Sequence, residues 1–249
     1  MFISAEDVQK IEDISAENGR IVRVFKRENG QKAYLRIYND MYVHPFESEI
    51  TAALKTLVDK SPLIAFVTGH GERACDDFGD RGYATFTKNP TFRSALINQG
   101  FRVENLTLGQ PVPDNVDVLV ISDMKIPFTP EEFANYSSFV DRGGNLIILG
   151  EVKRQKNMNP IVEKLGLRFA DGILVAPSKQ YLDDVIAAKI TEGALKASPY
   201  FAQLIQRGYT IITPSACAVE VIDSAKGFEI SEVLATNSEG SWIEYETTD

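Results

Sequence analysis

The sequence predicts an α/β protein built on a doubly wound, mostly parallel sheet. Two observations lead to this prediction. Between residues 63 and 150, apolar runs of strand length alternate with segments of helical pattern. Two of these runs, Leu63–Thr68 and Asp117–Ser122, are almost free of polar residues inside the run. Strands buried on both faces have this composition, and helices then cover each side of the sheet.

The composition bounds the class of protein. At about 100–200 residues per domain, 249 residues make one large domain or two small ones. Lys plus Arg is 26 and Asp plus Glu is 35, a net charge of −9, which gives no attraction to nucleic acid. His44 and His70 are the only histidines, so a multi-histidine metal site is excluded, and we expect no metal and no cofactor. No run approaches the ~18–20 apolar residues of a membrane span.

Residues 1–62 are predicted to form an N-terminal hairpin-plus-helix segment. The strands are Ile21–Phe25 and Ala33–Tyr38, and the Asn-Gly pair between them is a strong hairpin signal. Apolar residues at helical spacing then predict an amphipathic helix over 46–60.

Residues 63–249 are predicted to form the α/β domain. Its first part alternates strands and helices. The helix that starts at Thr129 carries the Thr-Pro-Glu-Glu sequence of a capping box. The expected elements are strand 63–68, helix 90–99, strand 101–106, strand 117–122, helix 129–142 and strand 145–149.

The second half of this domain is mixed. We expect a short helix after Asn159-Pro160 and a hairpin over Arg168–Val175 that turns at Asp171-Gly172. These strands are expected to continue the same sheet as a mixed C-terminal extension. Further strands are expected at 185–190, 210–213, 216–221 and 231–235, with a helix at 199–206.

Polar residues follow the predicted parallel strands. In open α/β sheets, ligands bind beyond the carboxyl ends of the strands. The residues at these positions are the candidate ligand-binding set: His70, Gly71, Glu72, Asp123, Glu151 and Arg154. The alternative is an ordinary solvated loop edge, in which His70 bonds to backbone groups of its own turn.

No strong catalytic motif accompanies these residues. The predicted strand 145–149 continues as Gly150-Glu151-Val152, where an amidotransferase-like enzyme would place a nucleophilic Cys. We therefore expect a protein that is not an enzyme. Two alternatives stay open: a hydrolase that uses His70, Glu72 and Asp123, and a Cys75–His70 pair.

Several short motifs in a fixed order resemble one family. They are Gly69-His70-Gly71-Glu72, Phe128-Thr129-Pro130-Glu131-Glu132, Gly143-Gly144-Asn145-Leu146 and the segment 234–242. Over about residues 20–245 the chain resembles the gliding-motility-associated, GldG-like auxiliary domain of an uncharacterised ABC-type transport system. The resemblance implies a flavodoxin-like or class I glutamine amidotransferase-like fold without the catalytic Cys.

The resemblance also implies a location and partners. It implies a domain on the extracytoplasmic, periplasmic side of the inner membrane, anchored by segments outside this chain. The partners would be an ABC permease and an ATPase. The alternative is a small-ligand or glycan-binding module with a pocket of aromatics such as Tyr83, Phe86 or Tyr181. Trp242, the only tryptophan, is expected to be a packing anchor.

Overall fold

The computed structural model describes residues 4–17, 19–42, 44–79, 82–222, 227–237 and 239–245. Ser238, within one motif of the resemblance, lies outside them. The chain divides into two compact units. Unit 1 is Met1–Gly69, Arg73–Val120 and Ser138–Ile147, and unit 2 is His70–Glu72, Ile121–Ser137 and Ile148–Asp249. The domain boundary after residue 62 stays a prediction.

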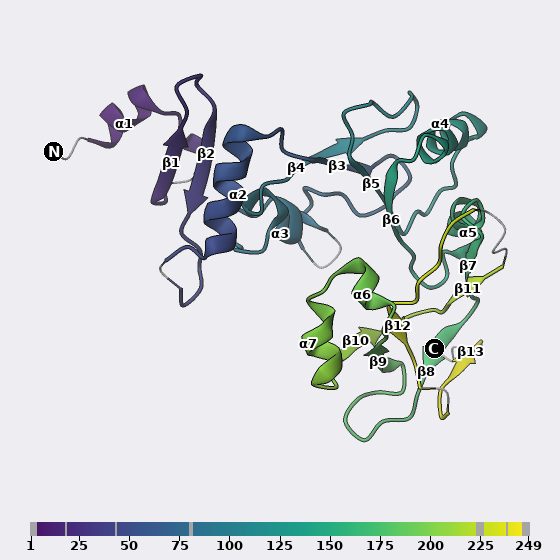
Figure 1. Cartoon of the computed structure of the whole chain (residues 1–249). Helices are drawn as coiled ribbons and strands as arrows, with labels where there is room; N and C mark the ends of the chain where they lie inside the picture. Colours follow the sequence, from purple (N-terminus) through teal and green to yellow (C-terminus); the bar gives the residue numbers. More distant parts are fainter. Residues whose placement is uncertain are drawn as a thin grey trace. The chain divides into compact units, whose positions relative to one another are not determined.

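The N-terminal part of unit 1 forms the expected hairpin and helix (Figure 1). Strands β1 (Val22–Lys26) and β2 (Lys32–Arg36) pair antiparallel. Helix α2 (Glu47–Val58) packs on them through a small buried cluster of Ala33, Ala53 and Leu57 with Phe25. The chain before β1 holds α1 (Ala5–Ile11) and the 3-10 turn η1 (Ser15–Glu17).

The expected parallel sheet is present. Its strands are β3 (Leu63–Val67), β4 (Arg102–Leu106), β5 (Val118–Ser122) and β6 (Asn145–Leu149), in the order β4-β3-β5-β6. Strand β3 runs parallel to both β4 and β5. Every residue of β3 is buried, as its composition predicts. By contrast β6, at the edge of the sheet, alternates between exposed and half-buried residues, so it is not buried on both faces as β3 is.

Helix α4 (Pro130–Asp141) confirms the predicted capping box, because Thr129 and Glu132 bond each other reciprocally. The helix expected over 90–99 is absent. The structure has α3 (Ala84–Thr87) and the 3-10 turn η2 (Leu96–Asn98) instead. The Asn98 amide donates to the carbonyl oxygens of Asn89 and Phe92 at 3.3 and 2.8 Å. A side chain that bonds nearby backbone in this way competes with helical bonding.

The C-terminal strands of unit 2 do not extend the parallel sheet, so that prediction is wrong. They form separate antiparallel sheets in the orders β10-β9-β12, β11-β7 and β13-β8. In β9 every second residue is buried, a pattern typical of antiparallel sheets with one covered face. The strands are β7 (Leu167–Phe169), β8 (Ile173–Val175), β9 (Val185–Ile190), β10 (Thr210–Pro214), β11 (Val219–Val221), β12 (Leu234–Ala235) and β13 (Trp242–Glu244).

The hairpin expected over 168–175 is also wrong. Strand β7 pairs with β11 and β8 pairs with β13, so the two segments have different partners. Gly172 turns the chain between them at φ 86°, and a Cβ there would lie 2.5 Å from the Glu244 carbonyl oxygen. Trp242 is 47% exposed on β13, so it is not the expected packing anchor.

Helix α5 (Gln155–Glu163) begins before Asn159-Pro160 rather than after it. Asn159 explains the difference, because its side chain donates to and accepts from the backbone of Phe169 at 3.2 and 2.9 Å. The residue that suggested a helix start instead fixes the end of β7. The remaining helices are α6 (Ala194–Ala197) and α7 (Phe201–Gln206).

Candidate functional site

The candidate site lies at the point where the strand order of the parallel sheet reverses. Across the sheet the order is β4, β3, β5, β6, so β3, the first of these strands in the sequence, lies between the second and the third. The connections therefore leave β3 and β5 in opposite directions, and such a switch point is the usual ligand position in open α/β sheets. Gly69 to Glu72 follow β3, and Asp123 follows β5. His70, Glu72 and Asp123 all belong to unit 2.

His70 is 4% exposed. Its Nε2 lies 3.2 Å from Oε2 of Glu132, and its Nδ1 lies 3.9 Å from Oε1 of Glu72. The ring of Phe128 meets the imidazole edge-on at 4.9 Å between centroids. The His70 carbonyl oxygen accepts from the backbone N–H groups of Lys125 and Ile126. The imidazole is thus held between two carboxylates and an aromatic ring.

The Glu72 side chain bonds to the backbone of its own loop. This side chain is 2% exposed, and Oε2 accepts the backbone N–H of His70 at 2.5 Å. Oε1 of Glu72 and Nδ1 of His70 are buried atoms that have no hydrogen-bond partner among the described residues. Buried polar atoms in this condition are rare and call for an explanation. A water or a ligand atom between Oε1 and Nδ1 would satisfy both.

Glu132 is the contact of His70 that the sequence did not reveal. The capping box predicted its role at the start of α4, where Oε2 accepts the N–H of Thr129 at 2.8 Å. The bond from the Thr129 backbone and the contact with His70 hold the pKa of Glu132 below its usual value. Glu132 is separated from His70 by 62 positions in the sequence, so no local spacing joins the two.

Asp123 sits in a strained backbone conformation. It is 5% exposed, its φ is 29°, and its N–H donates to the Leu149 carbonyl oxygen at 2.8 Å. Non-glycine residues at positive φ cost free energy and concentrate at functional sites. Gly71, in the same loop region, has φ 72°, a conformation that glycine adopts without strain.

Glu151 and Arg154 lie at the start of α5. The Arg154 N–H donates to the Glu151 carbonyl oxygen at 3.1 Å, and Arg154 occupies the N-cap position of the helix. Lys153 between them has φ 67°. The structure thus gives both residues a part in beginning α5, at the end of β6 where the sequence placed them.

The described residues contain no group of three or more His, Cys, Asp or Glu side chains placed to hold a metal ion. The Cys75 thiol is buried in unit 1, where Sγ donates to Asn105 at 3.0 Å. Burial raises the pKa of this thiol, which works against nucleophile formation. Of the aromatics proposed for a glycan pocket, Tyr83 packs on the core of unit 1, while Phe86 and Tyr181 are exposed.

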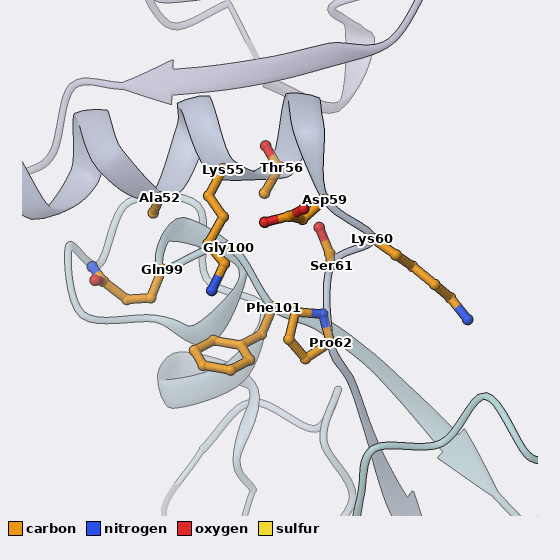
Figure 2. A pocket seen from close by; sticks show the side chains of 10 residues that line it. All are labelled: Ala52, Lys55, Thr56, Asp59, Lys60, Ser61, Pro62, Gln99, Gly100 and Phe101. Atoms are coloured by element: carbon orange, nitrogen blue, oxygen red, sulfur yellow. The ribbon is translucent and has the colours of Figure 1, made fainter.

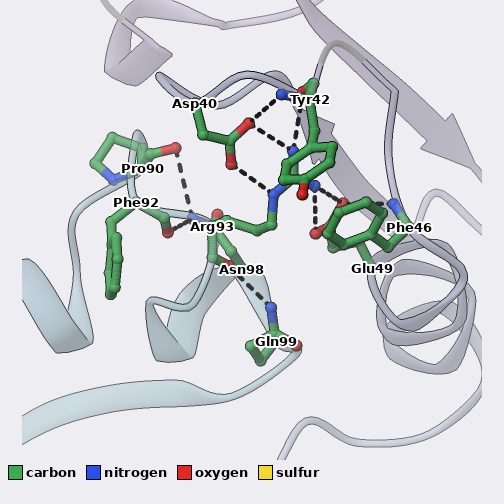
Figure 3. A network of polar contacts seen from close by, with 9 residues as sticks. All are labelled: Asp40, Tyr42, Phe46, Glu49, Pro90, Phe92, Arg93, Asn98 and Gln99. Atoms are coloured by element: carbon green, nitrogen blue, oxygen red, sulfur yellow. Dashed lines mark hydrogen bonds and ion pairs between the residues drawn. The ribbon is translucent and has the colours of Figure 1, made fainter.

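Sequence reasoning missed a partly buried ionic cluster in unit 1. Figure 3 shows Arg93 between Asp40 and Glu49. Its guanidinium donates to both oxygens of Glu49 at 2.6 Å, to both oxygens of Asp40 at 2.7 and 3.0 Å, and to the Tyr42 carbonyl oxygen at 3.0 Å. All three guanidinium nitrogens therefore donate hydrogen bonds. These bonds raise the pKa of Arg93 and lower that of Asp40.

Aromatic rings enclose the same cation. The Arg93 Cζ lies 4.3 Å from the ring centroid of Phe46 and 4.6 Å from that of Tyr38, within cation–π range. Burial raises the pKa of Tyr38 to about 12. The cluster fastens segment 89–99 to α2 and to the loop after β2, which is a structural role.

A small cavity in unit 1 lies between the end of α2 and the start of β4 (Figure 2). Its volume is about 70 Å³, well below the roughly 300–1,000 Å³ of small-molecule sites. Phe101 and Pro62 form its apolar side, and the Lys60 side chain points away from it (Figure 2). We assign it no ligand.

The family comparison bears on the segment that contains the switch point. Residues 61–182 match a family model. The model is of the ABC-transport auxiliary type, and its description is "ABC-type uncharacterized transport system". The match confirms the auxiliary-domain part of the resemblance, and it covers strands β3 to β8. No helix among the described residues has the length and apolar character needed to cross a membrane.

No curated protein matches the sequence significantly. Among solved structures, the chain is similar to one titled "mmIFT52 N-terminal domain", with a TM-score of 0.50 and 16% identity. The similarity covers 72% of this chain and 75% of that one. At this identity the likeness concerns the fold alone.

Proposed function

We propose that this chain is a non-catalytic auxiliary domain of an ABC transport complex, in which it binds the transport subunits. The observation that carries the proposal is the match of residues 61–182 to the family of an ABC-type transport system. The candidate site supports the non-catalytic part. His70 is buried and its Nε2 already contacts Glu132, while Glu72 accepts a backbone N–H of its own loop. General acid–base chemistry needs a group within reach of substrate.

Helix α2 provides the best contact surface for such a partner. Its inner face packs on β2 through Ala53 and Leu57. A second apolar row, at i, i+4 spacing, faces away: Phe46, Ile50, Leu54 and Val58 are 42%, 36%, 49% and 63% exposed. Rows at this spacing are the ridges that pack into the grooves of another helix. We propose that this row, the α2 ridge, contacts a helix of the ABC permease.

We further propose that the domain lies on the extracytoplasmic side of the inner membrane and is anchored by segments outside this chain. The motif resemblance to GldG-like auxiliary proteins supports this placement. The same resemblance supports the association with an ABC permease and ATPase in a system of the gliding-motility type.

Cross-linking of the parent protein in native membranes tests the proposal. We expect mild cross-linking and mass spectrometry to recover an ABC ATPase and a multi-span permease with it. A membrane-impermeant lysine reagent applied to spheroplasts should label the domain if it is extracytoplasmic. Recovery of the protein alone, in soluble form, would contradict the transport role.

A second candidate function is binding of a small polar ligand at the switch point. Two buried atoms favour it, Nδ1 of His70 and Oε1 of Glu72, because neither has a hydrogen-bond partner in the part of the chain that the structure describes. A polar ligand that bridges them should raise the melting temperature of the wild-type chain and leave that of His70→Phe unchanged. A metabolite and glycan screen that shifts neither protein, or shifts both equally, would remove this candidate.

A further inference from the structure

A large cavity in unit 2 lies apart from the residues at the switch point. Its volume is about 610 Å³, within the range of small-molecule sites and several times the roughly 150 Å³ that admits benzene in an engineered apolar cavity. Strands β7 to β12 all contribute to its wall. It extends from the buried residues Ile186 and Ala188 to the exposed residues Val219 and Leu234, so it is open to solvent.

The lining selects the chemistry of the ligand. Most of the wall is aliphatic, and the described lining residues include no aromatic ring, no lysine and no arginine. Sugars and nucleobases are bound by stacking on aromatic rings, and phosphates by cations. The wall offers neither. A flexible aliphatic chain is the ligand that an aliphatic wall of this size solvates best, because burial of each CH₂ contributes about 0.8 kcal/mol.

Apart from the Thr213 hydroxyl and the Cys217 thiol, the polar side chains of the described lining lie on one segment of the wall. Ser231, Thr236 and Asn237 supply hydroxyl and amide groups, and Glu232 is the charged residue of the described lining. Glu232 is exposed, and its backbone carbonyl oxygen is fixed by Thr191. Hydroxyl and amide groups suit an uncharged hydroxylated head group. A carboxylate at the same place repels an anionic one.

We propose that this cavity binds an aliphatic amphiphile with an uncharged head group, such as a monoacylglycerol. The proposal is independent of the transport role, since it rests on the wall of the cavity alone. Cys217 also lines the cavity, and this half-buried thiol reports occupancy directly. The other cysteine, Cys75, is 0% exposed and serves as an internal reference.

The test measures the alkylation rate of Cys217 by iodoacetamide, with glycerol monolaurate as the probe below its micelle concentration. We expect about tenfold protection of Cys217, with a one-to-one complex in native mass spectrometry. Laurate, which has the same chain and an anionic head, should bind about tenfold more weakly. Glu232→Gln should reduce the difference in affinity between glycerol monolaurate and laurate.

Two further variants test whether glycerol monolaurate binds inside this cavity. Ala218→Phe fills the cavity and should abolish protection, whereas Ala202→Phe, a matched change on the exposed face of α7, should leave it intact. Absence of a complex with the wild-type chain would overturn the proposal. So would equal affinity for laurate and monolaurate in both the wild-type chain and Glu232→Gln, because the head-group selection would then be wrong.

Discussion

The Arg93 cluster of unit 1 and the His70 cluster of unit 2 differ in how completely their polar groups are hydrogen-bonded. Around Arg93, all three guanidinium nitrogens donate hydrogen bonds, and Glu49, 1% exposed, accepts through both oxygens. Around His70, one imidazole nitrogen and one carboxylate oxygen have no hydrogen-bond partner among the described residues, and Asp123 nearby has a positive φ. The first arrangement is what stability alone requires. The second retains unsatisfied groups and strain, which are typical of a site where something else binds.

The largest expected effect comes from breaking the satisfied cluster. Arg93→Ala leaves the Glu49 carboxylate buried without its cation, so we expect a loss of about 3–5 kcal/mol in the free energy of unfolding. Urea denaturation measures it. Arg93→Lys is the matched control, which keeps the charge but not the bidentate geometry, and should lose less. If Arg93→Ala lowered the free energy of unfolding by less than about 1 kcal/mol, the cluster would not stabilise the fold as we expect.

A smaller effect is expected from His70→Gln, about 1–2 kcal/mol, because the imidazole has one carboxylate contact within 3.5 Å and one unsatisfied nitrogen. The same denaturation experiment gives the comparison. If His70→Gln destabilised the chain as much as Arg93→Ala, the two clusters would be equally structural, and the case for a ligand at the switch point would weaken.

The stability cost of Glu132→Gln should depend on pH, which tests the contribution of the ionised Glu132 to the His70 cluster. The pKa of Glu132 is lowered in the folded state, chiefly by the Thr129 bond. Its ionised form therefore adds stability above the unfolded-state pKa of about 4.3, and that stability is lost as pH falls through the lowered value. We expect Glu132→Gln to cost about 1 kcal/mol at neutral pH. Thermal melts should show this cost shrinking toward zero in strong acid.

An effect of similar size to that of Glu132→Gln is expected at the strained residue, Asp123. Asp123→Ala should cost about 1 kcal/mol more than Asp123→Asn, because asparagine tolerates positive φ better than alanine. Differential scanning calorimetry on the two variants measures the difference. Equal melting temperatures would show that the backbone at residue 123 relaxes, and that the conformation stores no strain.

Much of the fold follows from local sequence. The alternation of apolar runs and capped helices predicted the parallel sheet, the hairpin and α4, because burial pattern and capping chemistry act over a few residues. The C-terminal sheets were mispredicted for the opposite reason. Residues 167–169 pair with residues 219–221, and no local pattern encodes a partner so far away.

The candidate site was predictable only in part. The position of His70, Glu72 and Asp123 follows from the rule that ligands bind at the ends of parallel strands. The contact of His70 with Glu132 depends on how α4 packs, and the Arg93 cluster depends on the packing of three separate segments. The aliphatic cavity arises from strands that sequence reasoning had placed in the wrong sheet.

Site-specific photo-cross-linking tests whether the α2 ridge contacts the ABC permease. A photoreactive amino acid replaces Leu54 in the parent protein, in cells that make the whole transport system, with the same replacement at Glu104 on the exposed side of β4 as the control. We expect Leu54 to cross-link to the ABC permease and Glu104 not to. Cross-links to the permease from neither position, with the parent protein present in the membrane, would contradict it.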